Sequence, residues 1–209
     1  MRPRRYGLLL LILIASYLLS AFLGSRKHVG DVQVVLVTLA GLLALRTSPL
    51  RGRPAALLIS AGLIGSLLAI ILGLHSASDG GKGAAYLWLT LLLLAMVTVL
   101  IRHVIRLPDV TAQSLYGAIS GYLLIGLLFA AAYSSMYYFA GGHFFAGGQP
   151  ANLSVFQYFS FATLTTVGYG DYTAATSAGR AIAMIEAMSG QIFLATLVAK
   201  LVASYRRVS

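Results

Sequence analysis

A short segment between two apolar runs holds the residues whose types and spacing could do chemistry. It reads Thr163-Leu-Thr-Thr-Val-Gly-Tyr-Gly-Asp171, with Gly168 and Gly170 two positions apart. Glycine adopts positive φ without steric cost, so glycines that alternate with other residues let successive carbonyl groups point the same way. The Thr166 hydroxyl can add a further oxygen at the inner end of such a row. Oxygens arranged in this way can replace the water around a cation.

The string from Thr165 to Asp171 resembles the selectivity filter of potassium channels of the tetrameric pore-loop family. The resemblance covers roughly residues 115–205. It implies a pore domain at 109–209, with an outer helix at 113–139, a re-entrant pore helix at 154–165, a filter at 165–171 and an inner helix at 178–205. It also implies an ion-binding segment made of Thr165, Thr166, Val167, Gly168, Tyr169 and Gly170, with potassium at Thr166, Val167, Gly168 and Tyr169.

The chain contains a single filter string, although an ion needs oxygens on all sides. Cyclic symmetry supplies them when identical chains surround an axis, so we expect a homotetramer with one pore. No cofactor is expected beyond the bound potassium ions. Besides further copies of the chain, the expected binding partners are potassium, membrane lipid and an unidentified regulatory partner.

The residues around the filter are interpreted as its support. Pro150, Asn152 and Ser154 are typical of a helix start. Tyr158 and Phe159, with Phe161, resemble the aromatic residues that surround the filter in this family, and Asp171 follows the last filter glycine. Some family members carry a glutamate where this chain has Ala162.

Glu186 is an acidic residue within the last apolar run, a position where ionisable side chains are usually functional. It precedes Gly190 by four residues and should therefore lie one turn nearer the outside, at the height of the filter. We expect it to face the pore helix, with the hydroxyls of Ser160 and Thr163 as candidate partners. The hypothesis is that Glu186 braces the filter from behind, in place of the acid missing at Ala162.

The inner helix resembles the family in its spacing. Gly190 lies where many relatives have a hinge glycine. In register with it, residues three or four positions apart should line the cavity and take part in gating: Gln191, Leu194, Val198 and Val202.

Composition places the rest of the chain in a membrane. Of its 209 residues, 59% are hydrophobic and 10% charged, which excludes an ordinary soluble enzyme and a disordered chain. The predicted fold is all-α, with six transmembrane helices and the re-entrant pore helix. The six predicted spans are 6–24, 32–45, 55–74, 84–101, 115–139 and 178–205, of which 32–45 is the weakest.

The net charge of +10 reflects arginines at the ends of apolar runs rather than a surface for nucleic acid, which is not an expected partner. Basic residues at 2–5, 46–53, 102–106 and 206–207 favour cytoplasmic termini under the positive-inside rule. Arg26 and Lys27 oppose this orientation.

The first part of the chain, 1–108, resembles the four-helix domain that precedes the pore in voltage-gated channels. A voltage sensor needs several arginines on one helix, and none occurs from Ala84 to Ile101. We interpret this part as a scaffold for the pore, with lipid or ligand sensing as the alternative.

The sequence therefore predicts a passive, potassium-selective channel that is not strongly voltage-gated, similar to bacterial six-span channels of the inner membrane. An alternative is the pore subunit of a larger potassium uptake assembly, although such chains usually carry four pore repeats. An enzyme is disfavoured because no histidine or aspartate shares the face of Glu186.

Overall fold

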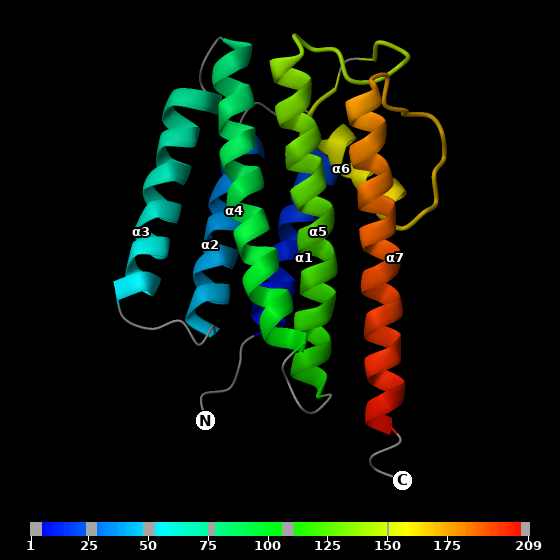
Figure 1. Cartoon of the computed structure of the whole chain (residues 1–209). Coiled ribbons are helices and arrows are strands. Elements are labelled where there is room, and N and C mark those ends of the chain that lie inside the picture. The colour runs from blue at the N-terminus through cyan, green and yellow to red at the C-terminus, as the bar shows by residue number, and fades with distance from the viewer. Residues whose placement is uncertain are drawn as a thin grey trace.

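The computed structural model describes residues 6–23, 29–47, 53–74, 78–105, 111–149 and 151–205. This part of the chain is helical, apart from loops and one isolated bridge between Phe145 and Ala174, and it contains no strand. The helices are α1 (Tyr6–Leu23), α2 (Val29–Thr47), α3 (Arg53–Leu68) with the π-helical turn η1 (Ala69–Leu74), α4 (Asp79–Ile105), α5 (Ala112–Phe139), α6 (Leu153–Leu164) and α7 (Ser177–Tyr205) (Figure 1). The predicted all-α class is confirmed.

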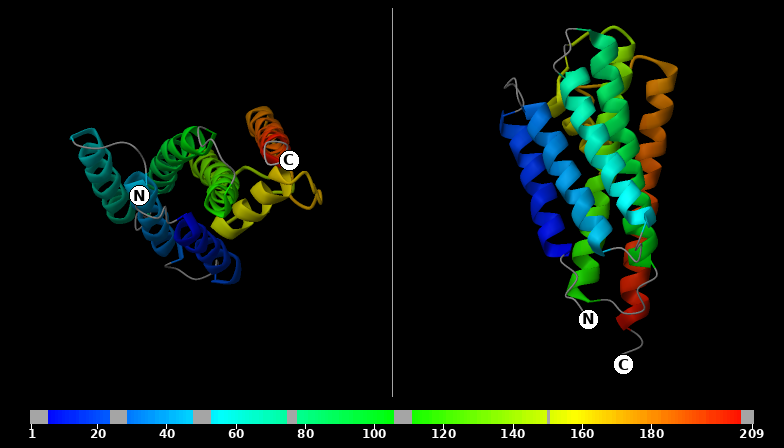
Figure 2. Two further views of the ribbon diagram at one scale, coloured as in Figure 1. Left: turned by 90° about the horizontal axis from the view of Figure 1, so that it is seen from below. Right: turned by 90° about the vertical axis from the view of Figure 1, so that its left-hand side faces the viewer.

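The long helices run alongside one another, and only the short α6 is inclined to them (Figure 1). Seen along the helix axes, α3 and α7 lie at opposite ends of the molecule, with α4 and α5 between them (Figure 2). Helix α1 begins on the side where α7 ends. Such an arrangement agrees with termini on one side of a membrane, although which side is cytoplasmic stays a prediction.

Helices α1 and α4 pack directly on α5 and α6 of the same chain. The most extensive helix contact in the described chain joins α4 to α5, and α1 contacts both α5 and α6. The ring of Tyr17 on α1 meets Phe161 on α6 edge to face, with centroids 4.9 Å apart. The predicted boundary at residue 108 lies outside the described residues.

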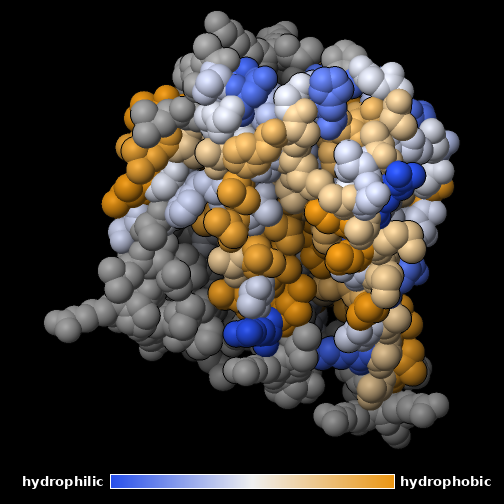
Figure 3. Space-filling model, turned by 45° about the horizontal axis from the view of Figure 1, so that its top comes forward, coloured by the Kyte–Doolittle hydropathy of each residue, from blue (hydrophilic) through white to orange (hydrophobic). Residues whose placement is uncertain are grey.

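Within the described ranges, three helical segments are long and apolar enough to cross a membrane: Asp79–Arg102, Ala112–Phe139 and Ser177–Ala203. The apolar parts of the other helices are shorter among the described residues, at Tyr6–Phe22, Val32–Gly41, Gly62–Ile71 and Leu153–Leu164. On the face seen in Figure 3, hydrophobic side chains cover the middle of the helices and hydrophilic ones gather toward both ends. Length and composition therefore support three of the six predicted membrane crossings, and the full set of six stays a prediction.

Two boundaries differ from the sequence-based expectation. The small and polar residues 76–83, which precede the predicted span 84–101, indicate a loop, yet α4 begins at Asp79. The Ser78 hydroxyl accepts a hydrogen bond from the Gly81 amide at 3.2 Å, and Asp79 lies in the first turn, where the helix dipole favours an acid. The third predicted span ends in the π-helical turn η1, which the apolar pattern did not indicate.

Candidate functional site

Helix α6 positions the predicted filter. Its first turn is capped by Asn152, whose side-chain oxygen accepts a hydrogen bond from the Val155 amide at 3.1 Å. The helix has 12 residues and is about 18 Å long, which is too short to cross a membrane. It ends at Leu164, with Thr165 as C-cap, one residue earlier than expected. Pro150 lies outside the described residues.

The backbone after α6 alternates between negative and positive φ. Gly168 and Gly170 have φ of +56° and +82°, as the glycine pattern predicts. Thr166, two residues before Gly168, also has a positive φ, of +59°. The alternation therefore begins at Thr166 rather than at the first glycine. A β-branched residue rarely adopts this conformation, so Thr166 must be held in it by its surroundings.

Hydrogen bonds to the last turn of α6 supply this restraint. The amide of Thr166 donates to the Thr163 carbonyl at 2.9 Å, and the amide of Gly168 donates to the Ala162 carbonyl at 3.1 Å. The Thr165 hydroxyl donates to the Phe161 carbonyl at 2.6 Å. Thr165 thus belongs to the helix end, and the segment with alternating φ starts at Thr166. Ala162, which lacks the acidic side chain of some relatives, contributes through its backbone.

The side chains of Val167 and Tyr169 are exposed in the single chain, by 53% and 71%. The ring of Tyr169 stacks on that of Tyr158, with centroids 6.0 Å apart and planes inclined by 7°. The Tyr158 ring also meets that of Tyr172, the residue after Asp171, edge to face with centroids 6.0 Å apart. Tyr158 therefore lies beside the filter segment, and the support role of Tyr158 and Asp171 stays a prediction.

Phe159 is also a predicted support residue, but its ring contacts lie elsewhere. It packs in an aromatic cluster with Tyr133, Phe144 and Phe145. Phe161 faces α1 instead, against Tyr17. Of the three aromatic residues expected around the filter, only Tyr158 has a ring contact with a filter residue among the described residues.

The loop between α5 and α6, called the outer loop below, forms backbone hydrogen bonds with the segment after the filter. The amide of Ala146 donates to the Thr173 carbonyl and that of Ala175 to the Phe144 carbonyl, both at 2.9 Å. Phe144 and Phe145 are buried below this pairing. Sequence reasoning treated this stretch as a glycine-rich loop and missed both residues. Two adjacent aromatic residues within a loop of small residues are the signal that could have indicated them.

Glu186 lies in a buried hydrogen-bond network that joins three helices. Its carboxylate accepts a hydrogen bond from the Tyr133 hydroxyl of α5 at 2.6 Å and another from the Ser160 hydroxyl of α6. The side chain is 0% exposed. The Ser160 partner agrees with the sequence-based expectation, whereas Thr163 does not reach the carboxylate. Tyr133 was missed, although a tyrosine within an apolar helix usually has a hydrogen-bond partner.

The Ser160 hydroxyl also lies 2.7 Å from the Gly126 carbonyl oxygen, so a second contact links α6 to α5. All members of the network belong to one chain. It lies on the side of α6 that faces α5 and α7, one turn before Leu164. This position connects Glu186 to the helix that carries the filter, while the effect on the filter itself stays a prediction.

Gly190 is buried where α7 crosses the end of α6. A Cβ atom at this position would collide with the Leu164 carbonyl oxygen and lie 3.0 Å from the Leu164 Cδ1 atom. The Tyr122 hydroxyl of α5 donates to the same carbonyl at 3.2 Å. Gly190 therefore faces α6 and does not line the side of α7 that carries Gln191, and α7 continues through it without a break.

We predict that Gly190→Ala separates α7 from α6 and lowers the stability of the fold. Overpacking of this kind costs about 1–3 kcal/mol. Thermal unfolding of the purified protein checks this. Gly80→Ala is the matched control, because a Cβ at this helical glycine meets nothing within 4 Å. Equal midpoints for the two variants would contradict the packing role of Gly190.

The four residues expected to line a cavity share one side of α7. Gln191, Leu194, Val198 and Val202 are all exposed in the single chain. The Gln191 amide nitrogen is 3.5 Å from the Thr166 hydroxyl oxygen, which places this side of α7 directly below the filter segment. The geometry thus joins one side of α7 to the inner end of the filter.

Comparison with known proteins identifies one related region. Residues 121–207 match a family model described as "Ion channel". The match supports an ion channel of the pore-loop type. The matched region includes most of α5, the whole of α6, the filter segment and α7. No curated protein and no solved structure matches the chain.

The match points to a transport protein rather than an enzyme, as the sequence predicted. It does not include α1 to α4.

Proposed function

We propose that the chain forms a homotetrameric, potassium-selective channel that conducts passively. The observation that carries this proposal is the alternating backbone of the filter segment, with positive φ at Thr166, Gly168 and Gly170. An alternating backbone can direct successive carbonyl groups to one side, where they replace the hydration shell of a potassium ion. The ion-binding oxygens then come from Thr166, Val167, Gly168 and Tyr169.

Assembly of four chains is supported by the surfaces that a single chain leaves exposed. Val167 and Tyr169 are uncovered, and so is much of α7, including Met184, Ile185 and Met188. Large apolar side chains next to the filter would be covered when copies meet around an axis. The same assembly would bring four filter segments together, which one chain cannot provide.

The front helices act as a scaffold in this proposal. Helix α4 packs along α5, and α1 supports α6 through the contact of Tyr17 with Phe161. The described basic side chains of α4, Lys82 and Arg102, lie near its two ends rather than along its middle. A helix fixed to the pore and without central charges is poorly suited to move in response to voltage.

We predict that opening depends only weakly on voltage. Strongly voltage-gated channels move about 3–4 charges in each of four subunits. The conductance of wild type in planar bilayers should therefore change gradually between negative and positive potentials. The double variant Arg102→Gln with Arg106→Gln should give the same curve, although Arg106 lies outside the described residues. A steep curve for wild type that flattens in the variant would contradict the scaffold role.

Ion flux into liposomes tests the proposed function. Purified protein should carry potassium down its gradient and largely exclude sodium, without ATP and without another protein. Equal permeation of both ions would contradict the selectivity. Potassium uptake only in the presence of a further subunit would favour the larger uptake assembly instead. Accessibility of labels at both ends of the chain in cells would test the proposed inner-membrane location with cytoplasmic termini.

A further inference from the structure

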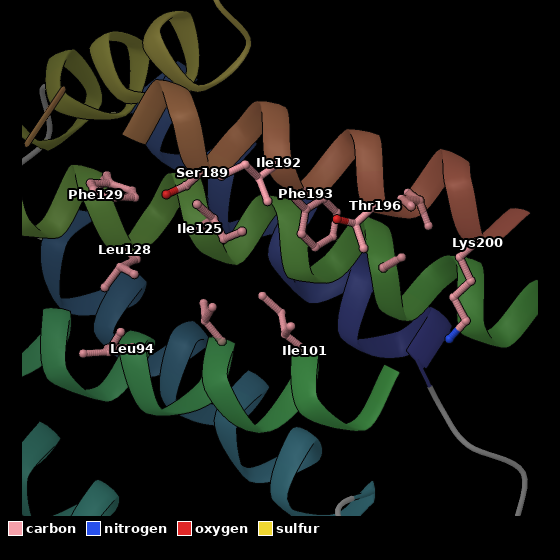
Figure 4. Close-up of a pocket in the computed structure, with 13 residues that line it drawn as sticks. Leu94, Ile101, Ile125, Leu128, Phe129, Ser189, Ile192, Phe193, Thr196 and Lys200 are labelled. Atoms are coloured by element: carbon pink, nitrogen blue, oxygen red, sulfur yellow. The ribbon is translucent and has the colours of Figure 1, made fainter. Parts of the chain in front are cut away.

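A groove of about 460 Å³ lies between α4, α5 and α7. Most of its walls are apolar, with Ile101 from α4, Ile125 from α5 and Phe193 from α7 among the lining side chains (Figure 4). Polar groups come from α7, as Ser189, Thr196 and Lys200. The volume is within the range of ordinary ligand sites.

The groove lies on the side of α7 that faces away from the ion path. Its α7 residues Ser189, Phe193, Thr196 and Lys200 are four, three and four positions apart and share one side of the helix. Phe193 is two residues from Gln191, which corresponds to about 200° around the helix axis. The groove is therefore separate from the surface that lies below the filter, and helices of a single chain form its walls.

The length of the groove matches one leaflet of a membrane. From Ser189 to Lys200 the helix rises by about 16 Å, at about 1.5 Å per residue. One leaflet contributes about 15 Å to a hydrocarbon core of about 30 Å. Lys200 lies at one end of the lining residues on α7 (Figure 4). An apolar slot of leaflet length with a cation at its end is complementary to an acyl chain that carries an anionic headgroup.

We propose that the groove binds an anionic phospholipid from the leaflet on the side of Lys200. One acyl chain lies along Phe193, Ile125 and Ile101, and the phosphate lies beside the Lys200 ammonium group. The end of the acyl chain that is farther from Lys200 reaches Ser189. Ser189 is the neighbour of Gly190, where α7 packs on the end of α6. Occupancy of the groove then fixes the spacing between α7 and the other two helices. Lipid binding is independent of whether the channel conducts potassium.

Native mass spectrometry of the purified full chain tests this with two lipids that have the same acyl chains, phosphatidylglycerol and phosphatidylcholine. Wild type should retain phosphatidylglycerol more strongly. Lys200→Gln should weaken phosphatidylglycerol binding about fivefold, the effect of one basic residue at a membrane surface, and leave phosphatidylcholine binding unchanged. Lys82→Gln is the matched control. Lys82 lies near the start of α4, at the end of that helix away from Lys200, so this variant should bind both lipids like wild type.

A second variant tests the apolar part of the groove. Thr196 is exposed and lines the groove, so Thr196→Phe should fill it and reduce the retention of both lipids, with helicity checked by circular dichroism. Equal retention of the two lipids by wild type would overturn the proposal, as would Lys200→Gln binding like wild type. An oligomer that retains no phospholipid would also overturn it and would assign the groove to a second copy of the chain. Because the readout is bound mass, none of these outcomes depends on potassium flux.

Discussion

Gly168→Ala and Gly170→Ala should each abolish potassium-selective flux. Both positions have positive φ, which costs an alanine about 1–2 kcal/mol. In a pore of four chains the cost is about 4 kcal/mol or more, which reduces the population of the conducting backbone about a thousandfold. A Cβ at either position meets nothing within 4 Å in the chain, so the effect arises from the backbone rather than from a clash. Potassium and sodium flux into liposomes measures it.

The outer loop offers a matched control for this experiment. Gly148 has a φ of +65° and a Cβ there also meets nothing within 4 Å. Gly148→Ala therefore carries the same conformational cost outside the filter segment, and its potassium selectivity should equal that of wild type. Selectivity that survives in both filter variants, or that is lost equally in Gly148→Ala, would refute the assignment of the filter.

Glu186→Ala should lower the stability of the fold by about 1–3 kcal/mol, because it leaves the buried Tyr133 hydroxyl without its acceptor, whereas the Ser160 hydroxyl keeps the Gly126 carbonyl. Glu186→Gln should be much milder, since its amide oxygen accepts from Tyr133 and its amide nitrogen can donate to the Ser160 oxygen. We expect the glutamine variant to assemble like wild type and to change open probability or filter inactivation. Thermal unfolding and single-channel recording distinguish the two effects.

A double-mutant cycle isolates the network from general damage. If Tyr133 stabilises α5 through Glu186, then Tyr133→Phe should cost little in the background of Glu186→Ala, and the two effects should not add. Additive effects would show that the two side chains act separately. Wild-type recordings from both Glu186 variants would reject a role of this residue in conduction.

Local sequence signals predicted much of this architecture. The apolar runs indicated the helices, Asn152 indicated the start of α6, and the spacing of Gly168 and Gly170 indicated an alternating backbone. Each of these features depends on interactions within a few residues of the chain, which a sequence displays directly. The predicted start of α4 was wrong because the small and polar residues 76–83 suggested a loop, while the capping by Ser78 stabilises a helix.

The remaining features depend on contacts between distant segments. Thr166 is β-branched and by itself disfavours positive φ, and it adopts this conformation because the end of α6 binds its amide. Tyr133 is 53 residues from Glu186, so helical spacing could not pair them. Phe144 and Phe145 entered the aromatic cluster only because the outer loop pairs with the segment after the filter. These relations follow from packing and could not be derived from local spacing.

The contact between Tyr17 and Phe161 has a consequence for the synthesis of the protein. The two residues are separated by roughly 140 positions, and ribosomes add about 5–20 residues per second. Helix α1 is thus made roughly 7–28 s before the helix it supports. During this interval α1 can already pack on α2, its next neighbour along the chain. The surface that receives Phe161 can therefore form before α6 is translated, and a slow or misdirected α1 would delay the packing of α6 in the same chain.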